Sequence, residues 1–367
     1  MRRPAIYNHS THRRSSPSVS NHEALTTGTK NRHRYSVVLE NPFRYFLFKT
    51  RSLWQLLPGF LRQSPLGLAY AWRLNEAVRT FSKRKQYFAT YFLRNRPELE
   101  LMRRIVDRKP EGSEVSLTVI GCSKGPEVYS ISWTLRRARP DLRIKIRAVD
   151  ISPEILEFAK NGIYSRAELR MLPERRNKWA DEKNQVHSLT GRDQIESLFE
   201  RLTSEEVEDM FDMDEEEVRI KPWLKEGIEW IVGDASSDEL RERLGLDEIV
   251  VANRFLCHMR PCGAERCLRA IGNLVKPGGY LFVSGVDLDV RTKVAVDSDW
   301  KAISELRKEM HEGDSSLLGG WPLGYWSLEP IDETRPDWHV RYASAFRVGE
   351  ASESSKELTY SRVAREA

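Results

Sequence analysis

The sequence has 367 residues, of which 40% are hydrophobic and 31% are charged, and it contains four cysteines. This composition is typical of a globular protein and excludes a disordered scaffold or a framework held together by disulfides. The formal net charge of +5 is unevenly distributed. Lys and Arg outnumber Asp and Glu by seven to one in residues 1–34 and by fifteen to five in residues 35–110, whereas residues 111–367 hold forty-eight acids against thirty-seven bases. A functional interpretation must explain why residues 1–110, the basic front, carry an excess of positive charge and why residues 111–367 carry an excess of negative charge.

Both ends of the sequence are polar and are predicted to be disordered tails. Residues 1–34 are rich in Ser, Thr and Arg and contain one acid, Glu23. A disordered tail is favoured over an organellar transit peptide, because Pro4 and Pro17 oppose an amphipathic helix there. Residues 350–367 form the second tail. The sequence has no run of eighteen apolar residues that would span a membrane, and we expect a cytoplasmic protein.

Four cysteines, Cys122, Cys257, Cys262 and Cys267, are consistent with a reducing compartment. The last three are five residues apart, and a step of five turns an α-helix by about 500°, so Cys262 and Cys267 would not share a helix face. Metal ligation by these cysteines with His258 is therefore not favoured. We interpret the cysteines as buried free thiols and expect no metal.

Residues 35–110 are predicted to form a small basic helical domain interrupted by prolines. Within it, the segment Phe43–Leu74 interleaves Phe, Trp, Leu and Tyr with Lys and Arg. The favoured interpretation is that these aromatic residues form the core of the domain and their neighbouring cations are solvated. The alternative is a basic aromatic surface that makes peripheral contact with a membrane.

Residues 111–349 alternate short β-rich runs with helical patterns, which indicates an α/β domain with a parallel sheet. An insertion at 165–227 interrupts the alternation, and its segment Thr203–Val218 carries nine acids and no base. The predicted strands are Val115–Ile120, Lys145–Ile151, Ile228–Val232, Glu248–Ala252 and Tyr280–Val286, with late runs at Tyr325–Leu328 and Val340–Val348. The predicted helices are Val128–Arg139, Pro153–Asn161, Gly263–Val275 and a stretch around Asp299–His311.

Several residues that suit a nucleoside ligand follow successive predicted strands. A loop with Gly121 and Gly125 follows the first strand, Asp150 ends the second, Asp234 follows the third and Asn253 follows the fourth. Ligands of open α/β sheets bind beyond the carboxyl ends of the strands, where a carboxylate accepts hydrogen bonds from ribose hydroxyls. Each acid alone is more often a solvated strand end or a helix cap, but together they favour a cofactor that contains adenosine.

The glycine loop distinguishes between two such cofactors. It has neither the GxGxxG spacing that seats a pyrophosphate nor the GxxxxGK[ST] spacing of a P-loop. A cationic sulfonium cofactor instead tolerates acids nearby, and Glu127 stands at the right place. With the turn Lys276–Gly279 before the fifth strand, this arrangement resembles the class I methyltransferases.

Four segments narrow the resemblance to the CheR-type methyltransferases, which methylate glutamates of chemotaxis receptors. The loop Gly121–Ile131 (GCSKGPEVYSI), the strand end Ala148–Ile151 (AVDI) and the helix Glu154–Tyr164 (EILEFAKNGIY) are similar to that family's patterns, and Thr90–Arg94 (TYFLR) looks like its T-x-F-F-R signature. The resemblance covers roughly residues 75–290. It implies S-adenosylmethionine as cofactor and a Rossmann-like, mostly parallel seven-stranded sheet, preceded here by the basic helical domain.

The resemblance also implies roles for individual residues. Gly121, Ser123 and Gly125 would form the loop beside the amino-acid part of the cofactor, and Glu127 would hold its ammonium group. Asp150, followed by Ile151, would take the ribose hydroxyls; Asp234, followed by Ala235, would take the adenine edge; and Asn253 would line the pocket near the sulfonium. Thr90 and Arg94 would close the site, with Arg94 near the transferred methyl group or, in the alternative, in a salt bridge between domains.

The acceptor side departs from the family pattern. The family commonly has Arg just before the Asn, where this sequence has Ala252, and its nearby aromatic position falls on Cys257 or His258. A carboxylate acceptor would need no general base and could be oriented by Arg94, whereas an amine or hydroxyl acceptor would require one, for which His258 is the candidate.

Three functions remain open at this stage. The first is methylation of glutamate in an acidic protein, and the second is O- or N-methylation of a small molecule on the same scaffold. The third is a non-catalytic module that binds the cofactor or a partner. The basic front makes an acidic protein or a small anionic acceptor the expected partner, and nucleic acid is not expected because no nucleic-acid motif is present.

Overall fold

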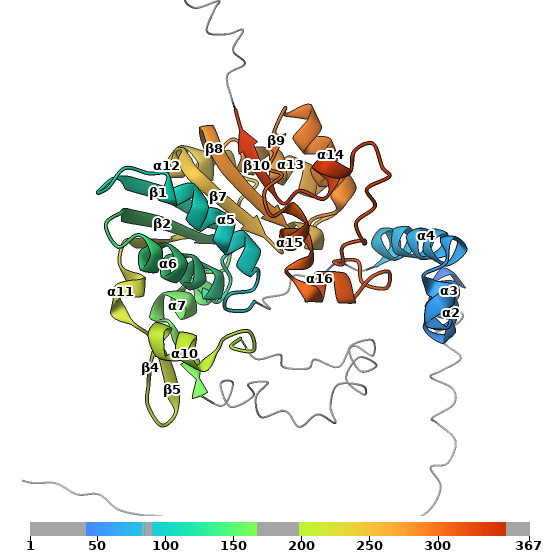
Figure 1. The fold of residues 1–367 in the computed structure, drawn as a ribbon, viewed down its shortest axis with the longest axis horizontal. Helices are drawn as coiled ribbons and strands as arrows, with labels where there is room; N and C mark the ends of the chain where they lie inside the picture. Colours follow the sequence, from blue (N-terminus) through green and yellow to red (C-terminus); the bar gives the residue numbers. More distant parts are fainter. Residues whose placement is uncertain (1–41, 83, 85–89, 167–197, 350–367) are drawn as a thin grey trace, which may run out of the picture. The chain divides into compact units, whose positions relative to one another are not determined.

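The structure is a computed structural model that describes residues 42–82, 84, 90–166 and 198–349 (Figure 1). Both predicted tails and most of the first half of the predicted insertion lie outside the described residues. The chain divides into two compact units, Met1–Leu56 and Leu57–Ala367. In the first unit the structure describes the helix α2 (Pro42–Leu56). The sheet, the helices that cover it and the candidate site all belong to the second unit.

A seven-stranded sheet forms the centre of the second unit, with strand order β6-β2-β1-β7-β8-β10-β9. Its strands are β1 (Glu114–Ile120), β2 (Arg143–Asp150), β6 (Ile228–Val232), β7 (Asp247–Asn253), β8 (Val275–Ser284), β9 (Lys301–Ala302) and β10 (Ala345–Val348). The first five are parallel, and β10 runs antiparallel to both β8 and β9. The predicted mostly parallel seven-stranded sheet is therefore confirmed.

Alternating side chains of the central strands supply both cores of this layered fold. In β7, Ile249 and Val251 belong to the core on one face, whereas Val250 and Ala252 belong to the core on the other. Because successive side chains of a strand point to opposite faces, a strand covered on both sides becomes a continuous apolar run. This continuous apolar run is the sequence pattern that predicted the strand.

Helices cover both faces of the sheet (Figure 1). Side chains of α5 (Arg96–Asp107), α6 (Pro126–Ala138) and α7 (Pro153–Asn161) enter one core, and those of α12 (Asp238–Leu244), α13 (Pro261–Gly272) and α14 (Leu288–Asp297) enter the other. Helix α5, which the sequence analysis placed in the helical N-terminal domain, packs against α6 within the same compact unit as the sheet.

Two further helices, α3 (Gly59–Arg62) and α4 (Pro65–Phe81), precede this layered core. Helix α4 begins at the N-cap Ser64, whose side chain accepts a hydrogen bond from the amide of Gly67. It is attached to the C-terminal region, because Asn75 Nδ2 donates to the Pro322 carbonyl at 3.0 Å. Within the described ranges, no helix combines the length and the apolar character needed to cross a bilayer.

The described part of the predicted insertion forms a small subdomain. Strands β3 (Ile163–Ser165), β5 (Glu217–Ile220) and β4 (Phe211–Met213) make an antiparallel sheet, which Figure 1 shows beyond α7 together with α10 (Ser204–Met210). Its acidic run is partly neutralised by the main domain: Arg96 Nη1 contacts Glu206 at 2.6 Å, and Arg137 Nη1 contacts Asp209 at 2.7 Å. The run is therefore not a uniformly solvated face.

Two sequence predictions about the C-terminal region were wrong, and one helix there was missed. The helix expected around Asp299–His311 is interrupted, because Asp299 and Leu306 adopt left-handed conformations (φ +53° for each) and β9 lies between them. A helix that the sequence analysis did not predict, α14, precedes this segment. Tyr325–Leu328 is no strand, since the Ser327 hydroxyl donates to the Gly324 carbonyl and closes a local turn.

The other late elements and one cysteine also differ from expectation. Only the second part of Val340–Val348 is a strand, β10, and the short helix α17 (Trp338–Arg341) precedes it. The predicted turn Lys276–Gly279 lies inside β8, which resumes its pairing with β7 after an irregularity in register. Cys262, expected to be buried, is exposed, whereas the other three cysteines are buried free thiols.

Candidate functional site

The backbone of the loop between β1 and α6 adopts left-handed conformations, which favour glycine. Gly121, Ser123 and Gly125 all have positive φ angles, of +70°, +50° and +94°. A Cβ atom at Gly121 would lie 2.8 Å from the Phe255 ring, so this position has no room for a side chain. The Gly121 amide donates to the Val149 carbonyl at 2.8 Å, which folds the loop over the end of β2.

Asp150 fastens that loop to the carboxyl end of β2. Its side chain is buried; Oδ2 accepts a hydrogen bond from the Ser123 amide at 2.8 Å, and Oδ1 accepts one from the Ser152 amide at 3.2 Å. Two apolar side chains stand exposed next to it, Ile151 (55% exposed) and Val232 (46%), the latter at the position of β6 that pairs with Asp150. The flat ring of an adenine would cover these two apolar side chains, so the residues present fit an adenosine.

Asp234 and Ala235 lie farther along this edge, after β6. Asp234 is exposed, and its Oδ1 accepts hydrogen bonds from the Ser236 amide at 2.9 Å and the Ser236 hydroxyl at 2.7 Å. Ala235 lines a cleft of about 260 Å³ between α12 and α13. The lining of that cleft includes neither Glu127 nor Asp150, so it is separate from the predicted cofactor site.

Three predicted residues meet at Glu127, in the first turn of α6. Glu127 Oε1 accepts hydrogen bonds from Arg94 Nη2 and from Asn253 Nδ2, both at 2.8 Å. Burial acts to lower the pKa of Arg94, but the carboxylates of Glu127 and Asp314 outweigh it and raise that pKa above its ordinary value. The sequence prediction that Arg94 and Glu127 belong to one site agrees with this geometry.

Asn253 is the central hydrogen-bonding group of this cluster. Its Nδ2 also donates to Glu98 Oε1 at 2.7 Å, and its Oδ1 accepts from the Ser284 amide at 2.8 Å and the Ser284 hydroxyl at 2.7 Å. Asn253 ends β7 and Ser284 ends the neighbouring strand β8, so the parallel pairing itself brings the two together. Glu98 was not predicted, and its place near the start of a helix gave no signal of proximity to Asn253.

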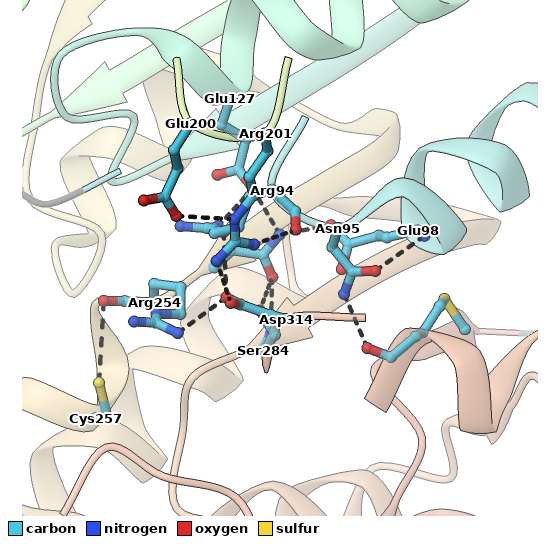
Figure 2. Close-up of polar contacts among 12 residues, drawn as sticks. Arg94, Asn95, Glu98, Glu127, Glu200, Arg201, Arg254, Cys257, Ser284 and Asp314 are labelled. Carbon is cyan, nitrogen blue, oxygen red and sulfur yellow. Dashed lines mark hydrogen bonds and ion pairs between the residues drawn. The ribbon is translucent and has the colours of Figure 1, made fainter. Parts of the chain in front are cut away.

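A second cluster of charges adjoins the first. The buried Asp314 carboxylate contacts Arg254 Nη1 at 2.9 Å, Arg201 Nη2 at 3.1 Å and Arg94 Nε at 3.7 Å, as Figure 2 shows. Burial, reinforced by the charge of Arg94, lowers the pKa of Arg254. Arg254 follows Asn253 directly and has a φ of +67°, a conformation that is costly for a residue other than glycine. The sequence analysis missed these contacts, although the family's expected Arg beside the Asn was a signal for Arg254.

The segment Thr90–Arg94 is fixed against the insertion and α6. The Phe92 amide donates to the Leu198 carbonyl at 3.0 Å, and the Leu93 amide donates to the Ser130 hydroxyl at 2.9 Å. Thr90 is buried. This anchorage explains how Arg94, which lies outside any strand or helix, reaches Glu127 with a defined geometry.

His258 lies near the second cluster, in a short 3-10 helix, η3 (Leu256–His258). Its Nδ1 is 3.0 Å from the Tyr325 hydroxyl oxygen. Burial, together with the positive charges of Arg254 and Arg84, lowers the pKa of His258 to about 4. The imidazole is therefore neutral at pH 7 and is a weak base.

Comparison with known proteins finds a similarity to the same family as the sequence motifs. Residues 89–200 match the family model described as CheR methyltransferase, SAM binding domain. A chemotaxis protein methyltransferase of Borreliella burgdorferi is 35% identical over 86 residues, which cover 22% of this chain and 30% of that protein. The chain spans less than a third of the length of the curated relatives it matches. The predicted resemblance to the CheR-type family is confirmed.

The solved structures to which the chain is similar include two methyltransferases. The CurJ carbon methyltransferase is 12% identical, with a TM-score of 0.33 and coverage of 87% of this chain and 71% of that one. Magnesium protoporphyrin IX methyltransferase from Synechocystis PCC 6803, solved with bound S-adenosylmethionine, is 11% identical, with a TM-score of 0.29 and coverage of 61% and 80%.

Proposed function

We propose that this protein is an S-adenosylmethionine-dependent methyltransferase whose acceptor is a carboxylate, as in methylation of a protein glutamate. The matched SAM-binding domain supports the cofactor. In the proposal Glu127 holds the cofactor's ammonium group, Asp150 accepts from the ribose hydroxyls, and Ile151 packs against the adenine. When bound, this cofactor supplies a methyl group on a cationic sulfur. The proposal also includes the prediction that Asp234 and Ala235, after β6, contact the adenine edge.

The observation that carries the choice of acceptor is the group of arginines beside Glu127. Arg94, Arg201 and Arg254 surround Asp314, and all three guanidinium groups are largely withdrawn from solvent. Each of these arginines already pairs with a carboxylate of the protein, and Arg94 is the one that contacts Glu127. In the proposal, Arg94 donates a charge-assisted hydrogen bond to the acceptor and so orients a carboxylate.

The reaction with a carboxylate needs no proton transfer. One acceptor oxygen attacks the methyl carbon, a C–O bond forms, and the C–S bond breaks with its electron pair remaining on sulfur; the products are a methyl ester and a neutral thioether. Arg94 would position the acceptor so that its oxygen lies in line with the breaking bond. His258, whose pKa is lowered to about 4, would be a poor general base for an amine or hydroxyl acceptor. Its predicted catalytic role is therefore not part of this proposal.

A small-molecule acceptor on the same scaffold is the second candidate. The observation in its favour is that the acceptor side is built partly by residues outside the matched range 89–200, namely Arg254, His258, Asp314 and Tyr325. A small anionic acceptor would satisfy the same arginines as a protein glutamate would. The two candidates differ in the size of the product, which makes them separable by experiment.

The test combines binding and labelling. Isothermal titration should detect S-adenosylmethionine binding; its absence would overturn the enzyme proposal. The protein is then incubated with methyl-labelled cofactor and a cell extract. Label in precipitated protein that mild alkali releases as methanol supports glutamate methylation, whereas alkali-labile label confined to the soluble fraction supports a small carboxylate. Alkali-stable label overturns the carboxylate acceptor, and binding without any label favours a non-catalytic module.

We also propose that the helices α3 and α4 contact an anionic membrane surface. Phe60 and Leu66 are 74% and 85% exposed in the second unit, next to Leu61 and the cations Arg62 and Arg73. Exposed large apolar side chains flanked by cations suit the interface of a bilayer with anionic lipids. This surface would hold the protein near a membrane-associated acceptor.

A further inference from the structure

Glu98 is a buried carboxylate whose two oxygens have different environments. It lies in the first turn of α5 and is 3% exposed. Oε1 accepts a hydrogen bond from Asn253 Nδ2 at 2.7 Å, whereas Oε2 is buried without a hydrogen-bond partner among the described residues. An ionised carboxylate rarely keeps a buried oxygen unpaired, because the desolvation cost is large. The geometry fits a carboxyl group that carries a proton on Oε2.

Asn253 links Glu98 to Glu127, the proposed ammonium-binding residue. Asn253 Nδ2 donates to Glu98 Oε1 and to Glu127 Oε1, so one amide nitrogen joins the two carboxyl groups. Like charges held this close disfavour ionisation of one member. The two carboxyl groups therefore respond to each other's charge.

Charged groups face Glu98 from several elements. Glu127 comes from α6, Arg94 from the segment before α5, Asp314 from the loop before α16 (Ser315–Gly319), and Arg291 from α14. Burial raises the pKa of Glu98 to about 8, the charge of Glu127 adds to the rise, and Arg94 and the hydrogen bond from Asn253 oppose it. At pH 7 Glu98 is thus mostly protonated, which agrees with its unpaired oxygen.

We infer that Glu98 is a positioning residue that releases a proton when the cationic methyl donor binds, so that the second carboxyl group becomes charged only when the donor's ammonium and sulfonium are in place. The inference rests on the proposed function, because it assumes that the donor's ammonium group reaches Glu127. Its physical basis is the shared Asn253 amide: burial and the charge of Glu127 together keep Glu98 protonated, and a cation that neutralises Glu127 removes the second of these two effects.

The sign of the pH dependence follows from linkage. The carboxyl group binds its proton more tightly in the free protein than in the complex, so the proton is released between the two pKa values. Through Glu98, the affinity for the cofactor should rise as the pH increases toward 8, by at most tenfold per pH unit for one proton. The cofactor's own amino group titrates near pH 8, so this contribution is read as the difference between the wild type and a variant in which only Glu98 is changed.

The experiment is isothermal titration of the full chain with S-adenosylmethionine in two buffers of different ionisation enthalpy at pH 7. Wild type should release between about half a proton and one proton more than Glu98→Gln, in which an uncharged amide replaces the acid and Oε1 can still accept from Asn253. Glu100→Gln on the same helix is the matched control, because arginine hydrogen bonds hold the pKa of Glu100 at about 2. This control should release as many protons as wild type.

The outcomes separate this inference from the proposed function. Binding with equal proton release by wild type and Glu98→Gln overturns the inference and leaves the methyltransferase proposal intact. Failure of the wild type to bind the cofactor overturns both. Where Glu98→Gln does not fold, infrared difference spectra of wild type at pH 7 decide the question: loss of a carboxylic acid C=O band on cofactor binding supports the inference, and an unchanged band overturns it.

Discussion

The substitution Asn253→Asp tests the site most directly, because it exchanges one atom group and retains the shape of the side chain. The amide of Asn253 makes four hydrogen bonds: it donates to Glu98 and Glu127, and it accepts twice from Ser284. Aspartate would keep the oxygen that faces Ser284. It would replace the donor NH2 group by an acceptor oxygen and place a third carboxylate against two others.

The expected cost follows from those contacts. A hydrogen bond to a charged group contributes about 1.5–3 kcal/mol, and two such bonds are lost in a buried site. We therefore expect the free energy of unfolding to fall by about 3–6 kcal/mol at pH 9. The cost should shrink at lower pH, because a protonated Glu98 can donate to the new carboxylate. Since the folded-state pKa of Glu98 is raised to about 8 from an ordinary 4.5, its contribution to stability is lost as the pH rises through that range.

Urea unfolding of the wild type and the variant at pH 6 and pH 9 measures this effect. Asn273→Asp is the matched control, because Asn273 is an exposed residue at the C-terminal end of α13; its unfolding free energy should stay within about 0.5 kcal/mol of wild type. A cost for Asn253→Asp below about 1 kcal/mol at pH 9, or a cost that is the same at both pH values, would refute the reasoning.

Three further predictions concern the glycine loop, the cofactor and the membrane. Gly121→Ala should lower the free energy of unfolding by about 2 kcal/mol more than Gly112→Ala, because both residues have a φ near +70° but only Gly121 faces a ring within 3 Å; equal losses in urea unfolding would contradict this. Asp150→Ala should abolish S-adenosylmethionine binding in isothermal titration, and retained affinity would exclude its ribose role. The double variant Phe60→Ser, Leu66→Ser should keep wild-type unfolding but lose sedimentation with phosphatidylserine vesicles; unchanged sedimentation would exclude the membrane surface.

The sheet and the cofactor side could be predicted because their information is local. A strand buried on both faces is an apolar run, and a helix was predicted to begin at Pro153, where α7 begins after the N-cap Ser152. The stretch Glu154–Tyr164 is not helical throughout, because α7 ends at Asn161 before the left-handed Gly162 and is followed by β3. Gly121 follows the last residue of β1, and Asp150 is the last residue of β2. Both positions could therefore be predicted from the local sequence. In a parallel sheet these ends share one edge, so the short motifs locate the cofactor side without tertiary information.

Two acids of the site, Glu98 and Asp314, could not be predicted, because they meet the other site residues only in the folded chain. Glu98 and Asp314 lie 155 and 61 positions away from Asn253 in the sequence, and each resembles an ordinary exposed acid there. Left-handed residues such as Leu306 likewise give no composition signal, which explains the wrong helix near residue 300. Burial converts such groups into a network, and burial of a particular polar side chain depends on tertiary packing.

The family commonly has an arginine directly before the Asn, whereas this sequence has Arg254 directly after Asn253. The position of Arg254 depends both on the local strand and on tertiary packing. Side chains of a strand alternate between faces, so an Arg before Asn253 and an Arg after it would both point away from the face of Asn253 if the strand continued. Strand β7 ends at Asn253, however, and the φ of +67° at Arg254 turns the chain. This turn brings the guanidinium to Asp314, which lies outside the range that matches the CheR family. The acceptor-side arginine is thus stabilised by the C-terminal region rather than by the sheet. Under the proposed function, the choice of acceptor would be set by residues from Arg254 onward together with Arg94 and Arg201, whereas the cofactor side would be set by the loops that follow β1 and β2.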